Sequence, residues 1–124
     1  MNSPPADSGQ AECHLIENVM AVLGRAWAGA VLQAMLDGAE RFTDIARGAP
    51  GVTDAVLSAR LKELCARGLV TRHVHPGPPV AVTYQLTPAG RDVEPVLTAI
   101  RTFGLAHPVI AGPRRERQPR SRNR

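Results

Sequence analysis

Apolar residues recur at helical spacing in the middle of the chain. Three leucines fall at positions i, i+4 and i+7, which is the spacing of a core-facing stripe on a helix: Leu57, Leu61 and Leu64. Thr53 is a favourable N-cap, and Gly68 allows the chain to leave the helix in a left-handed conformation. We therefore predict a helix over Thr53–Arg67.

Two strand-like segments and another helix follow this stripe. Leu69–His75 and Val80–Leu86 are rich in β-branched residues, and the Pro76–Pro79 segment between them fits neither a helix nor a sheet ladder. Thr87–Pro88 then supplies an N-cap and a proline at the first helical position. The pattern predicts a β-hairpin and a last helix that ends near Phe103.

Three further helices are predicted upstream. Apolar spacing over Ile16–Leu23 indicates one helix, Gly24–Arg25 interrupts it, and the spacing resumes over Trp27–Met35. Glu40–Phe42 is predicted to form a short strand that pairs with the hairpin, and Thr43–Arg47 a short helix. This order predicts an α+β, mainly helical fold of the winged helix-turn-helix type, with N- and C-terminal dimerisation helices.

The face of the Thr53–Arg67 helix that lies opposite the leucines is predicted to contact DNA. A helix fits the major groove, and small residues allow it to approach base edges closely. Ser58 can bond a base or a phosphate, Lys62 is expected to meet phosphate, and Arg60 is expected to brace the backbone. The predicted DNA-contacting residues are Thr53, Ala55, Ser58, Ala59, Arg60, Lys62, Arg41 and Arg72. A plain amphipathic helix is the alternative, but it leaves the strand–turn–strand unexplained.

The chain resembles the HxlR-type winged-helix regulators, a family close to the MarR type. The matching pieces are Cys13, Leu23–Trp27, Leu36–Arg72 and Tyr84–Leu97, and the resemblance covers about residues 13–104. It implies a homodimer that binds an inverted-repeat operator. It also implies that the cysteine at position 13 senses oxidants or electrophiles, as in some members of the family.

Several positions depart from the usual pattern of the family. His14 follows Cys13 where proline is common, and Ala55 stands where arginine or lysine is common. Cys65 replaces a common acidic residue, and Gly77–Val80 at the hairpin tip contains no Lys or Arg. These departures bear on the preferred DNA sequence and on how the hairpin contacts DNA.

Length and composition indicate one small domain. A chain of 124 residues can bury one modest core, and its low aromatic content makes that core aliphatic. Residues 1–11 are predicted to be disordered, 12–104 to form the DNA-binding and dimerisation domain, and 105–124 to form a disordered basic tail. The chain shows no signal-peptide pattern and no stretch long enough to span a membrane, so a cytoplasmic location is expected.

The net charge of +4 is unevenly distributed. Residues 113–124 hold six arginines and one glutamate, a net of +5, which leaves nine Lys/Arg against ten Asp/Glu in residues 1–112. The tail is predicted to make non-specific phosphate contacts, with a merely solubilising role as the alternative. The remaining chain must bind DNA through a local arrangement of cations rather than through bulk charge.

The last predicted helix carries more apolar surface than one small core needs. We expect it to pack against the first helix of a second copy, because two-fold DNA sites favour dimers. The predicted interface residues are Ile16, Val93, Val96, Leu97, Ile100 and Phe103. A purely intramolecular helix is the alternative. Pro95 inside this helix removes one backbone hydrogen bond and is expected to kink it.

No pattern in the chain predicts catalysis, a cofactor or a metal site. The sequence contains no phosphate-binding glycine loop, nucleophile elbow or zinc-type spacing. His73 and His75 share one strand face without an evident third ligand, which favours a solvated hairpin. Cys13 is the candidate redox sensor because a helix N-terminus favours the thiolate, and it is expected to react before Cys65.

These patterns together predict a dimeric, sequence-specific DNA-binding transcriptional regulator, acting as a repressor or autoregulator. Its expected partners are double-stranded DNA with an inverted repeat, a second copy of the chain and an effector, with no membrane. The effector is either a small molecule or a thiol-reactive compound. The alternative is a winged-helix module for protein association or small-molecule binding without DNA.

Overall fold

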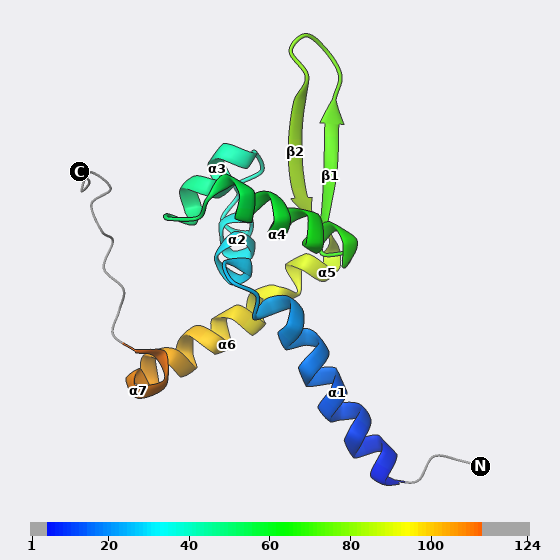
Figure 1. Cartoon of the computed structure of the whole chain (residues 1–124), viewed down its shortest axis with the longest axis vertical. Coiled ribbons are helices and arrows are strands. Elements are labelled where there is room, and N and C mark those ends of the chain that lie inside the picture. Colours follow the sequence, from blue (N-terminus) through cyan, green and yellow to red (C-terminus); the bar gives the residue numbers. More distant parts are fainter. Residues whose placement is uncertain (1–4, 113–124) are drawn as a thin grey trace.

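The computed structural model describes residues 5–112 and has an α+β, mainly helical fold (Figure 1). Its elements are α1 (Pro5–Leu23), α2 (Ala28–Leu36), α3 (Phe42–Gly48), α4 (Asp54–Ala66), β1 (Val70–His75), β2 (Ala81–Leu86), α5 (Pro88–Arg91), α6 (Val93–Ala106) and α7 (Pro108–Ala111). This is the predicted winged helix-turn-helix order, with α3 and α4 as the helix-turn-helix and β1–β2 as the wing.

Helix α4 forms as its sequence pattern predicts. The hydroxyl oxygen of Thr53 accepts a hydrogen bond from the amide of Val56 at 3.2 Å, so the predicted N-cap is present. The three leucines of the stripe are fully buried. Gly68 follows the helix with a φ of 81°, the left-handed conformation that ends it.

The wing is a two-stranded antiparallel hairpin whose root is buried and whose tip projects into solvent (Figure 1). Its register pairs Val70 with Leu86 at the root and His75 with Ala81 near the tip. Both residues of the root pair belong to the hydrophobic core, which anchors the hairpin beside α4. The predicted strands are confirmed to within one residue.

One hydrophobic core joins the helix-turn-helix to the rest of the chain. Helix α2 packs against α3, α4 and α6. The largest fully buried side chains come from α2, α3, α4 and the wing root: Val31, Leu32, Ile45, Leu57, Leu61, Leu64 and Val70. The core therefore fixes the orientation of α4 relative to the wing.

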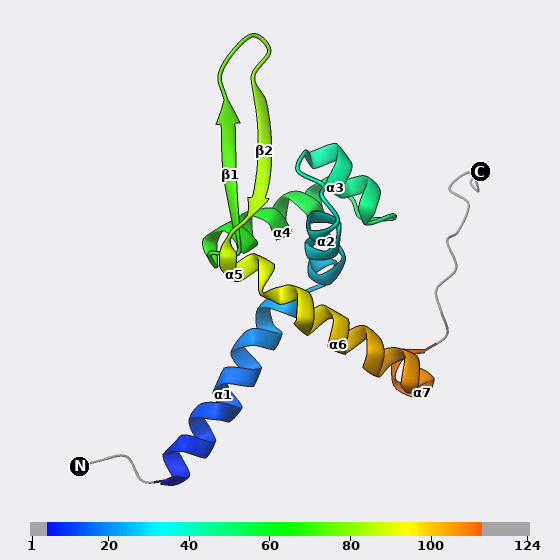
Figure 2. The same cartoon turned by 180° about the vertical axis from the view of Figure 1, so that it is seen from behind.

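Helices α1 and α6 extend away from this core in different directions (Figures 1 and 2). Residues 12–21 of α1 are all exposed. Within residues 5–112, no single helix is long and apolar enough to cross a membrane. Glu12–Leu23 and Ala28–Leu36 pass such a test only as a pair, and they are bent by 76°.

The predicted strand over Glu40–Phe42 does not form. The carbonyl of Glu40 accepts one hydrogen bond from the amide of Tyr84 at 2.7 Å, but α3 already begins at Phe42. Arg41 is the extended N-cap of α3, and Asp44 in the first turn favours the positive end of the helix dipole. The segment therefore makes a single ladder contact before the chain turns into a helix.

The predicted single helix after the wing is divided into α5 and α6. Its N-cap is confirmed, because Thr87 Oγ1 accepts from the amide of Gly90 at 3.0 Å. The interruption lies at Asp92 rather than at Pro95. Pro95 has no amide hydrogen for the carbonyl of Arg91, and its ring crowds that carbonyl, so the chain breaks immediately after Arg91.

Helical structure extends further toward both ends than predicted. Helix α1 begins at Pro5, so the expectation of disorder through residue 11 is wrong from that position onward. Proline suits a first helical position, and the alanines, Gln10 and Glu12 that follow have high helix propensity. At the other end, residues 105–111 belong to α6 and α7, whereas residues 113–124 with their arginines lie outside the described part.

Candidate nucleic-acid interface

One face of α4 is free of the core and presents small side chains to solvent. Four of the residues predicted to contact DNA are exposed on this face: Ala55, Ser58, Ala59 and Lys62. They lie opposite the buried leucine stripe, as the helical period requires. A face of this width and small side-chain size can approach base edges in a major groove.

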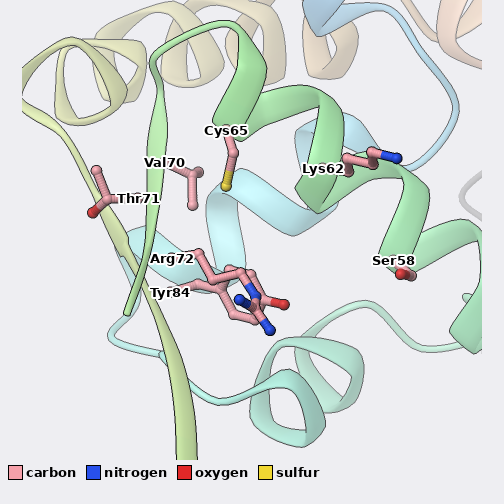
Figure 3. A pocket seen from close by; sticks show the side chains of 7 residues that line it. All are labelled: Ser58, Lys62, Cys65, Val70, Thr71, Arg72 and Tyr84. Carbon is pink, nitrogen blue, oxygen red and sulfur yellow. The ribbon is translucent and has the colours of Figure 1, made fainter. Parts of the chain in front are cut away.

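A groove separates α4 from the root of the wing (Figure 3). Its volume is about 650 Å³, and its lining residues come from α4, β1 and β2: Ser58, Lys62, Cys65, Val70, Thr71, Arg72 and Tyr84. Arg72 and Tyr84 are direct cross-strand partners. The lining contains two cations and no carboxylate, so the groove has a positive character.

The sequence predicted only part of this lining. Ser58, Lys62 and Arg72 were expected near DNA, whereas Cys65, Thr71 and Tyr84 were not assigned to the site. The α4 contribution carries a recognisable signal, because Ser58, Lys62 and Cys65 fall at i, i+4 and i+7. Placing Tyr84 beside Arg72 requires the wing register, which the sequence pattern alone leaves open.

Two predicted contact residues lie at the helix starts on either side of the helix-turn-helix. Arg41 is exposed at the N-cap of α3, and Thr53 is exposed at the N-cap of α4. The Thr53 hydroxyl oxygen is engaged by the cap, while its hydrogen remains free to donate. Both positions are compatible with a phosphate contact.

Residues 22–108, most of the chain, match the HxlR-like helix-turn-helix family. The chain belongs to the HxlR family.

Relatives in this family support the assignment. The chain is 33% identical over 95 residues to the HTH-type transcriptional regulator YodB of Bacillus subtilis (strain 168), covering 77% of this chain and 85% of YodB. It is 36% identical over 89 residues to the HTH-type transcriptional regulator YybR of the same organism, covering 72% and 71%. The structure of the redox regulator HypR in its reduced form is similar, with a TM-score of 0.69 and 33% identity over 77% of this chain and 95% of HypR. The chain is therefore a DNA-binding helix-turn-helix transcriptional regulator.

Arg60 occupies a different environment from the one predicted. Its Nε donates to the carbonyl of Ala26 at 2.9 Å, and its Nη1 lies 3.3 Å from a carboxylate oxygen of Glu63. Arg25 pairs with the other oxygen of Glu63 at 3.4 Å. Because only 12% of the Arg60 side chain is exposed, it joins α4 to the α1–α2 loop instead of bracing DNA.

The α1–α2 loop carries a feature that the sequence did not indicate. Trp27 has a φ of 72°, a left-handed conformation that is uncommon for a bulky residue. A side chain at Gly51, between α3 and α4, would lie 3.2 Å from the Trp27 ring. The indole thus covers the turn of the helix-turn-helix, where only glycine leaves it room.

The two wing histidines form local hydrogen bonds. His73 Nε2 lies 2.9 Å from Thr71 Oγ1, and His75 Nε2 lies 2.9 Å from Thr83 Oγ1. The described residues contain no group of three metal-ligating side chains. The histidines are therefore part of a solvated hydrogen-bonded strand face.

The two cysteines of this HxlR-family chain differ in environment. Cys13 is exposed, but it lies well inside α1 and not at its N-terminus, so the predicted dipole effect on its thiol does not apply. Cys65 is half-buried in the groove. Burial raises the pKa of the Cys65 thiol, and the positive charge of Arg72 offsets part of that effect.

The residues predicted for the dimer interface separate into two groups. Ile16, Val96, Ile100 and Phe103 are exposed. Val93 and Leu97 are only 6% and 9% exposed and belong to the core of one protomer, so their assignment to the interface is wrong. The structure adds exposed apolar residues that were not predicted: Leu15, Val19, Met20, Leu105, Val109 and Ile110.

Proposed function

We propose that this HxlR-family chain is a homodimer that represses transcription by binding an inverted-repeat operator with α4 of each protomer. The observation that carries this proposal is the exposed face of α4, lined by small residues and continuous with the cationic groove beside the wing. A two-fold dimer presents two such helices, which suits a DNA site with two-fold symmetry.

The dimer is inferred from apolar surface on α1 and α6. Ile16, Met20, Ile100 and Phe103 are each more than half exposed, although all are large and apolar. Contiguous exposed apolar surface on two projecting helices is typical of an association site. A second copy of the same two helices would cover this surface and set the distance between the two α4 helices.

The effector is proposed to be a thiol-reactive compound that modifies Cys13. This thiol is exposed on α1 and therefore lies among the apolar residues assigned to the dimer. YodB, one of the relatives, has a solved structure after treatment with diamide, and HypR is described as a redox regulator. A change at α1 would alter the spacing of the two α4 helices. A small molecule bound between the dimer helices is the second candidate effector.

Selection of binding sites from a random DNA pool tests the proposed function directly. The full chain should enrich one inverted repeat, and fluorescence anisotropy should then give two protomers per duplex. Mild diamide treatment should release that duplex from the native protein but not from a Cys13→Ser variant. A pool without any enriched sequence would contradict operator recognition.

A module without DNA binding is the second candidate function. One observation favours it: residues 1–112 carry a net charge near −1, and the wing tip holds no Lys or Arg. Such a module would associate with another protein through the wing or the groove. The same selection experiment separates the two candidates, because this module would enrich no DNA sequence.

A further inference from the structure

We propose that the groove between α4 and the wing root seats a backbone phosphate of the bound DNA, held by Lys62 and Arg72. The electrostatic contact of the wing is then made at its root and not at its tip. This inference rests on the proposed operator binding and specifies which part of the chain holds the DNA backbone.

The distribution of charge along the wing supports this placement. Arg72 is the only Lys or Arg between residues 70 and 86, so every other position of the hairpin lacks a permanent positive charge. The tip instead exposes Val80, and Val74 is exposed on β1 below it. A backbone contact that depends on a fixed charge must therefore come from the root of the wing.

Lys62 and Arg72 are also free to bind an anion. In the part of the chain that the structure describes, ion pairs engage Arg25, Arg47 and Arg60, whereas Lys62 and Arg72 form none. Both side chains line the same groove, one from α4 and one from β1 (Figure 3). Two unpaired cations in a groove without carboxylates favour an anionic occupant.

The geometry of a helix in the major groove brings a phosphate strand to this position. An α-helix with its side chains is about 10–12 Å wide, close to the roughly 12 Å width of the groove. When α4 fills the groove, the two backbones must pass along its flanks. One flank is the wall formed by Ser58 and Lys62, which belong to both the exposed face of α4 and the lining of the groove.

Cys65 provides a built-in reporter of this site. Its thiol lines the groove, whereas Cys13 lies on α1, which extends away from the wing (Figures 1 and 3). Alkylation of the full-length dimer by N-ethylmaleimide can be followed at both cysteines by mass spectrometry. Saturating operator should abolish alkylation at Cys65 and leave the rate at Cys13 unchanged.

Salt dependence gives a second measurement with matched variants. Lys62→Met and Arg72→Met keep the aliphatic stem but remove the charge. Each should flatten the dependence of log K on log salt by about 0.9 for one lost phosphate contact. Arg91→Met is the control, since Arg91 is exposed on α5 and outside the groove lining, and it should leave the slope unchanged.

The outcomes distinguish this inference from the proposed function. A stable operator complex in which Cys65 still reacts at its free rate would overturn the phosphate seat alone. The same holds if both charge variants keep the native salt slope. Protection of Cys65 by inorganic phosphate without DNA, at matched ionic strength, would assign the groove to a free anion. Failure to bind any duplex would overturn the proposed function together with this seat.

Discussion

Arg60 shows how the surroundings of a side chain decide its role. On the helical period it lies beside the DNA-reading face, yet its guanidinium is held by the carbonyl of Ala26 and the carboxylate of Glu63. A charge that is nearly buried must be paired to be stable. Its contribution is therefore to fix α4 against the α1–α2 loop.

Arg60→Met should weaken operator binding without a change in salt slope. The variant loses hydrogen bonds that hold α4 in place, so the free energy of unfolding should fall by about 1–2 kcal/mol. Urea denaturation and anisotropy at several salt concentrations measure the two effects. Arg47→Met removes an exposed pair with Asp44 and should cost less than about 0.5 kcal/mol. A flattened salt slope for Arg60→Met would instead indicate a direct phosphate contact.

Cys13 should be oxidised before Cys65 under mild peroxide treatment. Cys13 is exposed, whereas burial raises the pKa of the Cys65 thiol and so reduces its thiolate fraction near neutral pH. Cys65 modification should therefore increase only as the pH becomes alkaline. Mass spectrometry of each cysteine over time provides the measurement, and faster oxidation of Cys65 near neutral pH would contradict the prediction.

At the scale of elements, close packing of α5 against the wing root positions the wing. A Cβ at Gly90 would collide with the carbonyl oxygen of Leu69 and lie 3.0 Å from a methyl carbon of Leu86. The amide of Thr87 donates to the same Leu69 carbonyl at 3.0 Å. These contacts tie the end of α4, both strands of the wing and α5 into one unit.

Gly90→Ala should destabilise the protein by about 1–3 kcal/mol, because the added methyl group meets backbone that cannot easily move. Gly29→Ala is the matched control. It is also a glycine-to-alanine change in a helix, but the nearest atom to its Cβ lies 3.9 Å away. Alanine there should be neutral or stabilising by up to about 1 kcal/mol. Similar melting temperatures for both variants would mean that α5 can shift freely from the wing.

The whole molecule leaves much of its apolar surface uncovered as a single chain. Large apolar side chains on α1, α6 and α7 are exposed, while the core beneath α4 is complete without them. Two projecting helices with exposed apolar faces can be stabilised by a second copy. The spacing of the two DNA-reading helices would then depend on how α1 and α6 pack between protomers.

Val96→Asp should abolish the dimer and operator binding together. Val96 is 40% exposed on α6, and burying an unpaired carboxylate between protomers is costly. Light scattering gives the mass of the variant, and anisotropy gives its affinity for the operator. Val74→Asp is the control, because this exposed valine lies on the wing, and that variant should stay dimeric. An intact Val96→Asp dimer would place the interface elsewhere.

The local elements of this chain follow from its sequence because their causes lie within a few residues. The leucine period and the Thr53 cap specify α4, the β-branched runs around the prolines specify the wing, and Thr87–Pro88 opens α5. Only the tertiary structure decided which exposed positions remain free. It placed Arg60 against a loop 34 residues earlier in the chain, buried Leu97 in the core, and joined Lys62, Cys65 and Arg72 in one groove. Each of these depends on contacts between separate segments, and neither helical period nor strand alternation encodes how two such segments are packed together.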